Sequence, residues 1–159
     1  MDPTDTAAVA AQFDRLRGRV SDRRRIAEVT PGIAKGSHVM LVQVESLQAS
    51  VIGLKVEGRE LTPNLNRLAR ESYHFPKTFT HFGAGNTADV EFAANTSLYP
   101  PGEQAASVTY GDKAIPSLPK AARDAGYSAV TFHANTAHFW NRSNLYDALG
   151  FTKYYDSEF

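Results

Sequence analysis

The sequence predicts an α/β fold with a mostly parallel central sheet, because strand-like apolar runs alternate with helix patterns. Residues 39–46, VMLVQVES, form a continuous β-branched run, typical of a strand covered on both faces. A second such run, YSAVTFHA at 127–134, follows a helix pattern that stops at Gly126. The chain has 159 residues, of which 42% are hydrophobic, enough for the core of one domain.

Composition excludes several classes of protein. The formal net charge is zero, so we expect no global attraction to nucleic acid or to an anionic membrane. The absence of cysteine excludes disulfides, thiolate nucleophiles and cysteine zinc sites. Residues 1–12 carry acids where a signal peptide has positive charge, and no apolar run is long enough to cross a bilayer. The arginines at 15–25 favour a solvated helix face, with a membrane-proximal basic segment as the alternative.

The chain divides into a lead-in and a domain. Residues 1–37 are predicted to be a polar helical lead-in or linker that breaks at TPGIAKGSH, and the domain covers 38–159. Besides a helix that starts at about Thr87, three helices are expected in the domain. In the first, at 61–72, Thr62 suits the N-cap and Pro63 the first turn. The end signals of the other two, at 118–125 and 139–150, are Ser117, Gly126 and Gly150.

Polar side chains follow the predicted strands. Ligands of open α/β sheets gather at the carboxyl ends of the strands. Glu45, His133 and the loop around Trp140 fall at these ends. Position therefore makes them candidate site residues.

Thr87 lies in HFGAGNTADVEF, at the start of a predicted helix. Its hydroxyl is typical of a helix cap. The functional alternative is a nucleophile: free N–H groups at the helix terminus hold a phosphate, and a nearby metal lowers the pKa of the hydroxyl. Gly83 and Gly85 would then let the backbone approach a substrate closely. Asp89 and Glu91 suit the helix dipole but would repel a bare phosphate unless a cation is present.

The other candidates also have two interpretations each. Glu45 is either a paired charge at a strand end or a ligand of a hard metal ion. Trp140 and Arg142 either pack and pair on the surface, or form a pocket wall and a phosphate clamp. His133 fits a hydrogen-bonded histidine at a strand end better than a ligand or an acid.

Five motifs occur in order: VESLQ, TPNLNRLA, GNTADVEF, NTSLYP and FHANTAHFWNR. Their succession over residues 38–159 closely resembles the lipoteichoic acid synthase family, phosphoglycerol transferases within the alkaline phosphatase and sulfatase superfamily. The resemblance implies a three-layer sandwich around a mostly parallel sheet, of which this chain holds only the N-terminal portion.

The resemblance also implies roles for residues. Thr87 matches the nucleophile that forms a covalent phosphoglycerol intermediate and ligates the metal, usually manganese. Glu45 matches a metal-binding glutamate, and Trp140 and Arg142 match positions that line the glycerophosphate pocket. His133 is a further candidate for substrate binding.

The implied donor is phosphatidylglycerol, and the implied acceptor is a polyglycerolphosphate chain or a glycolipid. The family works at the extracellular face of the cell membrane, to which membrane helices absent from this chain attach it. Its metal site is completed by an Asp-His pair beyond the position of Phe159, and a pocket histidine follows there too. Two ligands, Glu45 and Thr87, bind a divalent ion poorly. We therefore expect the isolated chain to be inactive and marginally stable.

Three alternatives remain. A phosphoethanolamine transferase shares the threonine nucleophile, although FWNR favours the glycerophosphate branch. A formylglycine sulfatase needs a C/S-x-P-x-R motif, and SLPKA lacks the arginine. The alternative from another class is a truncated, non-catalytic remnant or binding module.

Overall fold

A computed structural model describes residues 11, 14, 32, 34–79 and 82–158. The chain forms two compact units, Met1–Val42 and Gln43–Phe159. Most of the predicted lead-in, including the arginines at 15–25, lies outside the described residues. No helix in the described part combines the length and the apolar character needed to cross a membrane.

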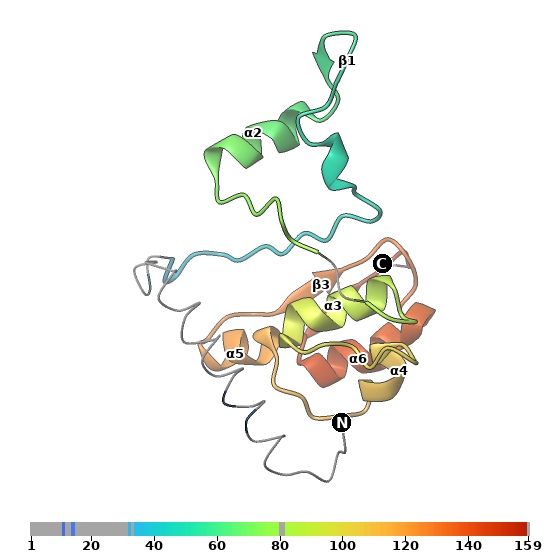
Figure 1. Cartoon of the computed structure of the whole chain (residues 1–159). Coiled ribbons are helices and arrows are strands. Elements are labelled where there is room, and N and C mark those ends of the chain that lie inside the picture. The colour runs from blue at the N-terminus through green and yellow to red at the C-terminus, as the bar shows by residue number, and fades with distance from the viewer. Residues whose placement is uncertain (1–10, 12–13, 15–31, 33, 80–81, 159) are drawn as a thin grey trace. The chain divides into compact units, whose positions relative to one another are not determined.

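The second unit contains both short strands and helices (Figure 1). In chain order its elements are η1 (Ala49–Val51), β1 (Lys55–Val56), β2 (Arg59–Glu60), α2 (Pro63–Glu71), α3 (Thr87–Thr96), α4 (Ala106–Tyr110), α5 (Leu118–Asp124), β3 (Val130–Phe132), η2 (Phe139–Asn141), α6 (Arg142–Leu149) and β4 (Lys153–Tyr155). The predicted α/β class is therefore confirmed. The two sheets in the described residues are small, with two strands each, in place of one large central sheet.

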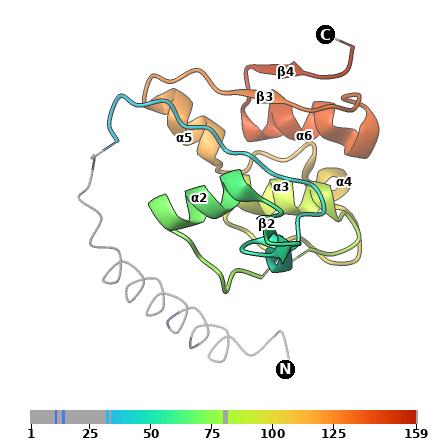
Figure 2. The ribbon, with the colours of Figure 1, turned by 90° about the horizontal axis from the view of Figure 1, so that it is seen from above.

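Strands β3 and β4 form the parallel pair. Val130 pairs with Lys153, and Phe132 with Tyr155. Figure 2 shows the two strands side by side with α6 next to them. Strands β1 and β2 are antiparallel and form a hairpin, because Glu57 and Gly58 between them both have positive φ, 50° and 79°.

The prediction that residues 39–46 form a strand of the sheet is wrong. These residues join neither sheet, and their apolar side chains are exposed, Met40 by 86% and Val39 by 77%. An apolar β-branched run has the side chains of a buried strand, but a strand also needs neighbours for its N–H and C=O groups. In the described part of the chain no such neighbour is present.

The core lies among the helices that follow Thr87. Helices α3, α4, α5 and α6 contact one another, and aromatic rings extend the core toward β4. The buried apolar residues of this cluster are Phe92, Ala106, Ile115, Leu145, Tyr146 and Leu149. Helix α3, which begins at Thr87, is therefore held in position by its contacts with these helices.

The predicted helix ends are mostly confirmed. Helix α2 begins at Pro63 after Thr62, but the Thr62 side chain makes no capping bond, and its hydroxyl donates to the Val51 carbonyl. Helix α6 begins at Arg142 rather than at 139, because Trp140 and Asn141 have positive φ, 58° and 53°, which no α-helix accommodates. It ends as predicted at Gly150.

Ser117 caps α5, as predicted. Its hydroxyl accepts the Lys120 N–H and donates to the Leu149 carbonyl, and the residue is buried. We expect Ser117→Ala to lower the free energy of unfolding by about 1 to 2 kcal/mol, because the cap and a buried hydrogen bond are lost together. Urea denaturation measures this. Ser72→Ala is the control, since Ser72 is exposed and bonds only to Leu68 O, and a similar loss there would contradict the interpretation.

Candidate functional site

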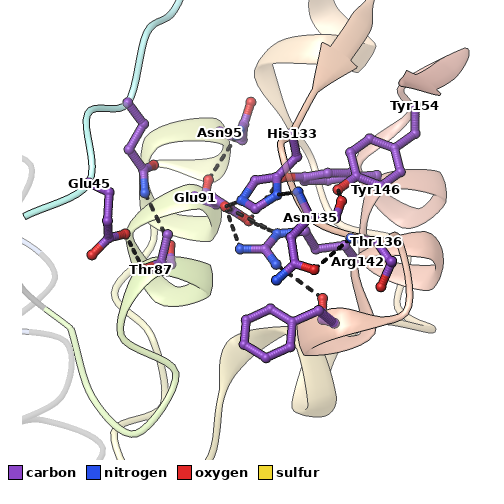
Figure 3. Close-up of polar contacts among 12 residues, drawn as sticks. Glu45, Thr87, Glu91, Asn95, His133, Asn135, Thr136, Arg142, Tyr146 and Tyr154 are labelled. Carbon is purple, nitrogen blue, oxygen red and sulfur yellow. Dashed lines mark hydrogen bonds and ion pairs between the residues drawn. The ribbon is translucent and has the colours of Figure 1, made fainter. Parts of the chain in front are cut away.

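Thr87 is the first residue of α3, and its hydroxyl points at Glu45 (Figure 3). Thr87 Oγ1 donates to Glu45 Oε2 at 2.7 Å, and Ser46 Oγ donates to Glu45 Oε1 at 3.0 Å. Gln43 Nε2 donates to the Thr87 carbonyl at 3.3 Å. The structure thus brings together the predicted nucleophile and the predicted metal ligand, which are 42 residues apart in sequence.

The hydroxyl of Thr87 is not a helix cap. Asn86 occupies the N-cap position, and its side chain makes no capping bond. The N–H groups of Ala88, Asp89 and Val90 donate to carbonyls of Gly85 and Asn86, at 2.9 to 3.2 Å. The expectation that free N–H groups of this first turn hold a phosphate is therefore wrong for these three groups.

The two glycines before Thr87 have a packing role. A Cβ at Gly85 would lie 2.7 Å from the Asp89 Cγ, and one at Gly83 would overlap the backbone of Gly102. Close contacts inside the protein thus account for both glycines, and a close approach of this backbone to a substrate stays a prediction. Asn86, between Gly85 and Thr87, has φ 44° and ψ −112°, a conformation that non-glycine residues rarely adopt.

Asp89 is fully buried and faces the glycine loop. Its Oδ2 accepts the N–H groups of Gly83 and Gly85 at 2.8 and 3.0 Å, and its Oδ1 accepts the N–H of Ala106 at 2.8 Å. Its charge is therefore stabilised by three donors inside the protein.

Glu91, one helical turn after Thr87, is also paired. Arg142 donates from Nε and Nη2 to its carboxylate at 2.9 to 3.2 Å, and Tyr146 Oη donates at 2.9 Å. The Arg142 side chain is 1% exposed, and its Nη1 donates to the Phe139 carbonyl. Arg142 is therefore the cation that neutralises Glu91.

Electrostatics follow from these contacts. Burial disfavours the charge of Arg142, but the hydrogen bonds and the charge of Glu91 more than offset this and raise its pKa. Burial, and then the charge of Glu91, raise the pKa of Tyr146, so its hydroxyl stays a donor. Hydrogen bonds from Thr87 and Ser46 hold the pKa of Glu45 below its ordinary value, and the charge of Arg142 adds to this.

His133 lies next to Glu91 and Arg142 (Figure 3). Its Nε2 is 3.9 Å from Glu91 Oε1, and its Nδ1 accepts the N–H of Asn135. Trp140 is in η2, half-buried, with its ring at an edge-to-face contact with Phe139. Whether Trp140, His133 and Arg142 contact a substrate stays a prediction.

The donor atoms of Glu45 and Thr87 are of a kind that fits a hard divalent cation. Carboxylate and hydroxyl oxygens are preferred by Mn²⁺ and Mg²⁺, and these two converge to 2.7 Å. Among residues 34–79 and 82–158, however, no group of three or more histidines, cysteines or acids could hold a metal. Glu45 and Thr87 therefore remain predicted metal ligands, and the described residues add no cluster of such groups to them.

Two further site residues were not assigned roles from sequence. The sequence identifies Asp89 and Glu91 only as charges that suit the helix dipole and would repel phosphate, and it does not identify their partners. The i, i+4 spacing of Thr87 and Glu91 was the available signal, because it places both side chains on one face of a helix. Nothing in the sequence pairs Glu91 with Tyr146, 55 residues later.

Comparisons with known proteins agree on one group. Residues 37–158 match the Sulfatase family. Lipoteichoic acid synthase 2 of Bacillus subtilis (strain 168) is 39% identical over 130 residues, and lipoteichoic acid synthase of Staphylococcus aureus (strain USA300) is 33% identical over 159. These alignments cover 80% and 96% of this chain, but only 20% and 25% of the relatives.

A solved structure is similar as well. The crystal structure of the lipoteichoic acid synthase LtaP from Listeria monocytogenes superposes with a TM-score of 0.78 at 40% identity. The match covers 80% of this chain and 31% of that one. The chain thus spans between a fifth and a third of the proteins it matches.

Proposed function

Because the chain belongs to the lipoteichoic acid synthase family within the sulfatases, we propose that it is part of a phosphoglycerol transferase with Thr87 as nucleophile. Residues 38–159 would be the N-terminal portion of the catalytic domain, with β3 and β4 within a larger, mostly parallel sheet. The observation that carries the proposal is the 2.7 Å hydrogen bond from the Thr87 hydroxyl to Glu45, at the start of a helix held by its neighbours.

The reaction would take place in two displacements. In the first, Thr87 Oγ1 attacks the phosphorus of phosphatidylglycerol, and the bond to diacylglycerol breaks, with a proton passing to the leaving alcohol. In the second, a hydroxyl of a polyglycerolphosphate chain or glycolipid attacks the phosphorus of the threonine ester, the bond from phosphorus to Thr87 Oγ1 breaks, and a proton passes to Oγ1 to restore the hydroxyl. A lipid donor would place this chemistry at a membrane surface, and the resemblance to lipoteichoic acid synthases favours the extracellular face of the cell membrane, with no role for nucleic acid.

Glu45 would orient the nucleophile. The Thr87 O–H points at Glu45 Oε2, so the lone pairs of its oxygen face away from the carboxylate and would be available to an incoming phosphorus. Glu45 and Ser46 are exposed, which leaves this side of Thr87 accessible to a headgroup. Glu45 is thus a positioning residue in the absence of a metal, and a ligand in its presence.

The acids of α3 do not oppose a phosphate. Asp89 is bonded to three N–H groups, and Glu91 is neutralised by Arg142. Arg142 would therefore act indirectly, by cancelling the negative charge of Glu91 one turn of α3 away from Thr87. Direct contact of Arg142, Trp140 or His133 with the glycerophosphate is the finer form of the proposal.

Glu45 and Thr87 would hold a divalent cation, preferably Mn²⁺, which when bound stabilises negative charge on the phosphoryl oxygens and on the threonine oxygen. We expect EDTA to abolish glycerophosphate transfer by the intact native protein, and Mn²⁺ to restore it. Glu45→Gln should raise the Mn²⁺ concentration for half-maximal activity by at least about tenfold, because a charged oxygen ligand is lost. A fluorescent phosphatidylglycerol assay over a Mn²⁺ titration measures both.

Glu103→Gln is the matched control, since Glu103 is exposed. It should leave the Mn²⁺ requirement unchanged. Transfer that survives EDTA, or a Glu45→Gln protein with the Mn²⁺ requirement of the wild type, would remove Glu45 from the metal site.

A further inference from the structure

We propose that Asp89 is a positioning residue, which fixes the loop before Thr87 and thereby aims the nucleophile. The inference rests on the proposed function of Thr87. Asp89 is fully buried two residues after Thr87, and neither of its oxygens bonds to the Thr87 side chain. It acts on the hydroxyl through the backbone.

The three donors of Asp89 come from two separate segments. Gly83 and Gly85 belong to the loop that precedes α3, and Ala106 is the first residue of α4. One carboxylate thus ties the loop to the first turn of α3 and to a neighbouring helix. Ala105, the N-cap of α4, has no capping side chain, so Asp89 also satisfies an N–H group at that helix start.

Only a carboxylate can make this set of bonds. All three donors are backbone N–H groups, and both Asp89 oxygens accept, Oδ2 from two donors and Oδ1 from one. An asparagine amide has a single acceptor oxygen, and its NH2 group would face at least one N–H. There is no space for a side chain at position 85 next to Asp89, because a Cβ on Gly85 would lie 2.7 Å from the Asp89 Cγ.

The consequence is a defined backbone at Asn86. This residue, between the tethered Gly85 and the nucleophile, has φ 44° and ψ −112°. A sparsely populated conformation persists only where its surroundings hold it. The Asp89 bonds on one side and α3 on the other supply that restraint, and the Thr87 hydroxyl consequently faces Glu45.

The test is Asp89→Asn in the intact native protein with phosphatidylglycerol as donor. We expect kcat per folded molecule to fall about a hundredfold while KM stays within about threefold, because misplacing a reacting group by roughly 1 Å has that effect on rate. Hydrogen exchange of the peptide that contains residues 83–86 should become faster. Asp112→Asn is the control, an exposed aspartate paired with Lys113, and it should change neither quantity.

Two results would overturn the inference. One is a kcat per folded molecule within about twofold of the wild type, which leaves Asp89 a purely structural role. The other is an unchanged rate of hydrogen exchange at residues 83–86, which would show that Asp89 does not restrain this loop, whatever the activity of the variant. If Asp89→Asn does not fold, Gly85→Ala, which keeps the charge and displaces one oxygen, is judged by the same criteria. A wild-type protein that transfers no glycerophosphate would contradict the proposed function alone, since hydrogen exchange at residues 83–86 would still show whether Asp89 restrains the loop.

Discussion

Thr87→Ala in the intact native protein is expected to lower the rate of glycerophosphate transfer from phosphatidylglycerol by at least about a thousandfold, because no other group replaces a lost nucleophile. Thr87→Ser, which keeps a hydroxyl, should retain measurable transfer. The rate is followed by release of labelled diacylglycerol, and circular dichroism establishes that each variant is folded.

Thr96→Ala is the matched control for this loss. Thr96 is in the last turn of the same helix, and its hydroxyl donates to the Phe92 carbonyl at 2.8 Å. The substitution therefore deletes the same atoms as Thr87→Ala, but at a position that does not contact Glu45. Its transfer rate should remain within about threefold of the wild type. Activity of Thr87→Ala equal to that of Thr96→Ala would mean that Thr87 is not the nucleophile.

Arg142→Met is expected to lower the free energy of unfolding by about 3 to 5 kcal/mol. The substitution leaves the charge of Glu91 buried with no cation, and removing one partner of a buried ion pair has this cost. Glu91→Gln together with Arg142→Met should recover part of the loss, since no charge is then left unpaired. Urea denaturation of the purified proteins gives the values.

Arg67→Met is the control for Arg142. Arg67 pairs with Glu71 at 3.9 Å, and both side chains are more than half exposed, so the expected loss is below about 1 kcal/mol. A double variant no more stable than Arg142→Met alone would show that the arginine stabilises the fold mainly by packing its side chain.

Local signals in the sequence predicted much of the fold. Pro63, Ser117 and Gly150 determine helix ends through backbone geometry and capping, which depend on neighbours in sequence. The start of α6 was misplaced by three residues, since the left-handed conformations of Trp140 and Asn141 depend on the surrounding fold. The run at 39–46 was misassigned as a paired strand because pairing depends on partners, which its composition does not reveal.

The site was partly predictable. Thr87 and Glu45 were assigned from motif and strand position, and the structure places their side chains in contact. The charges of Asp89 and Glu91 were noticed, but their partners depend on contacts over 17 and 51 residues of sequence. Arg142, predicted as a phosphate clamp, is nearly fully covered and paired with Glu91, a relation that only the packing of α3 with α6 establishes.

The central claim is that Thr87 carries the glycerophosphoryl group during transfer. Its most direct measurement is peptide mass spectrometry of the intact native protein, quenched during turnover of phosphatidylglycerol with Mn²⁺ present. We expect a glycerophosphoryl adduct on Thr87, absent in Thr87→Ala and lost when acceptor is added. Continued turnover with no adduct on Thr87, or an adduct on a different residue, would contradict the claim.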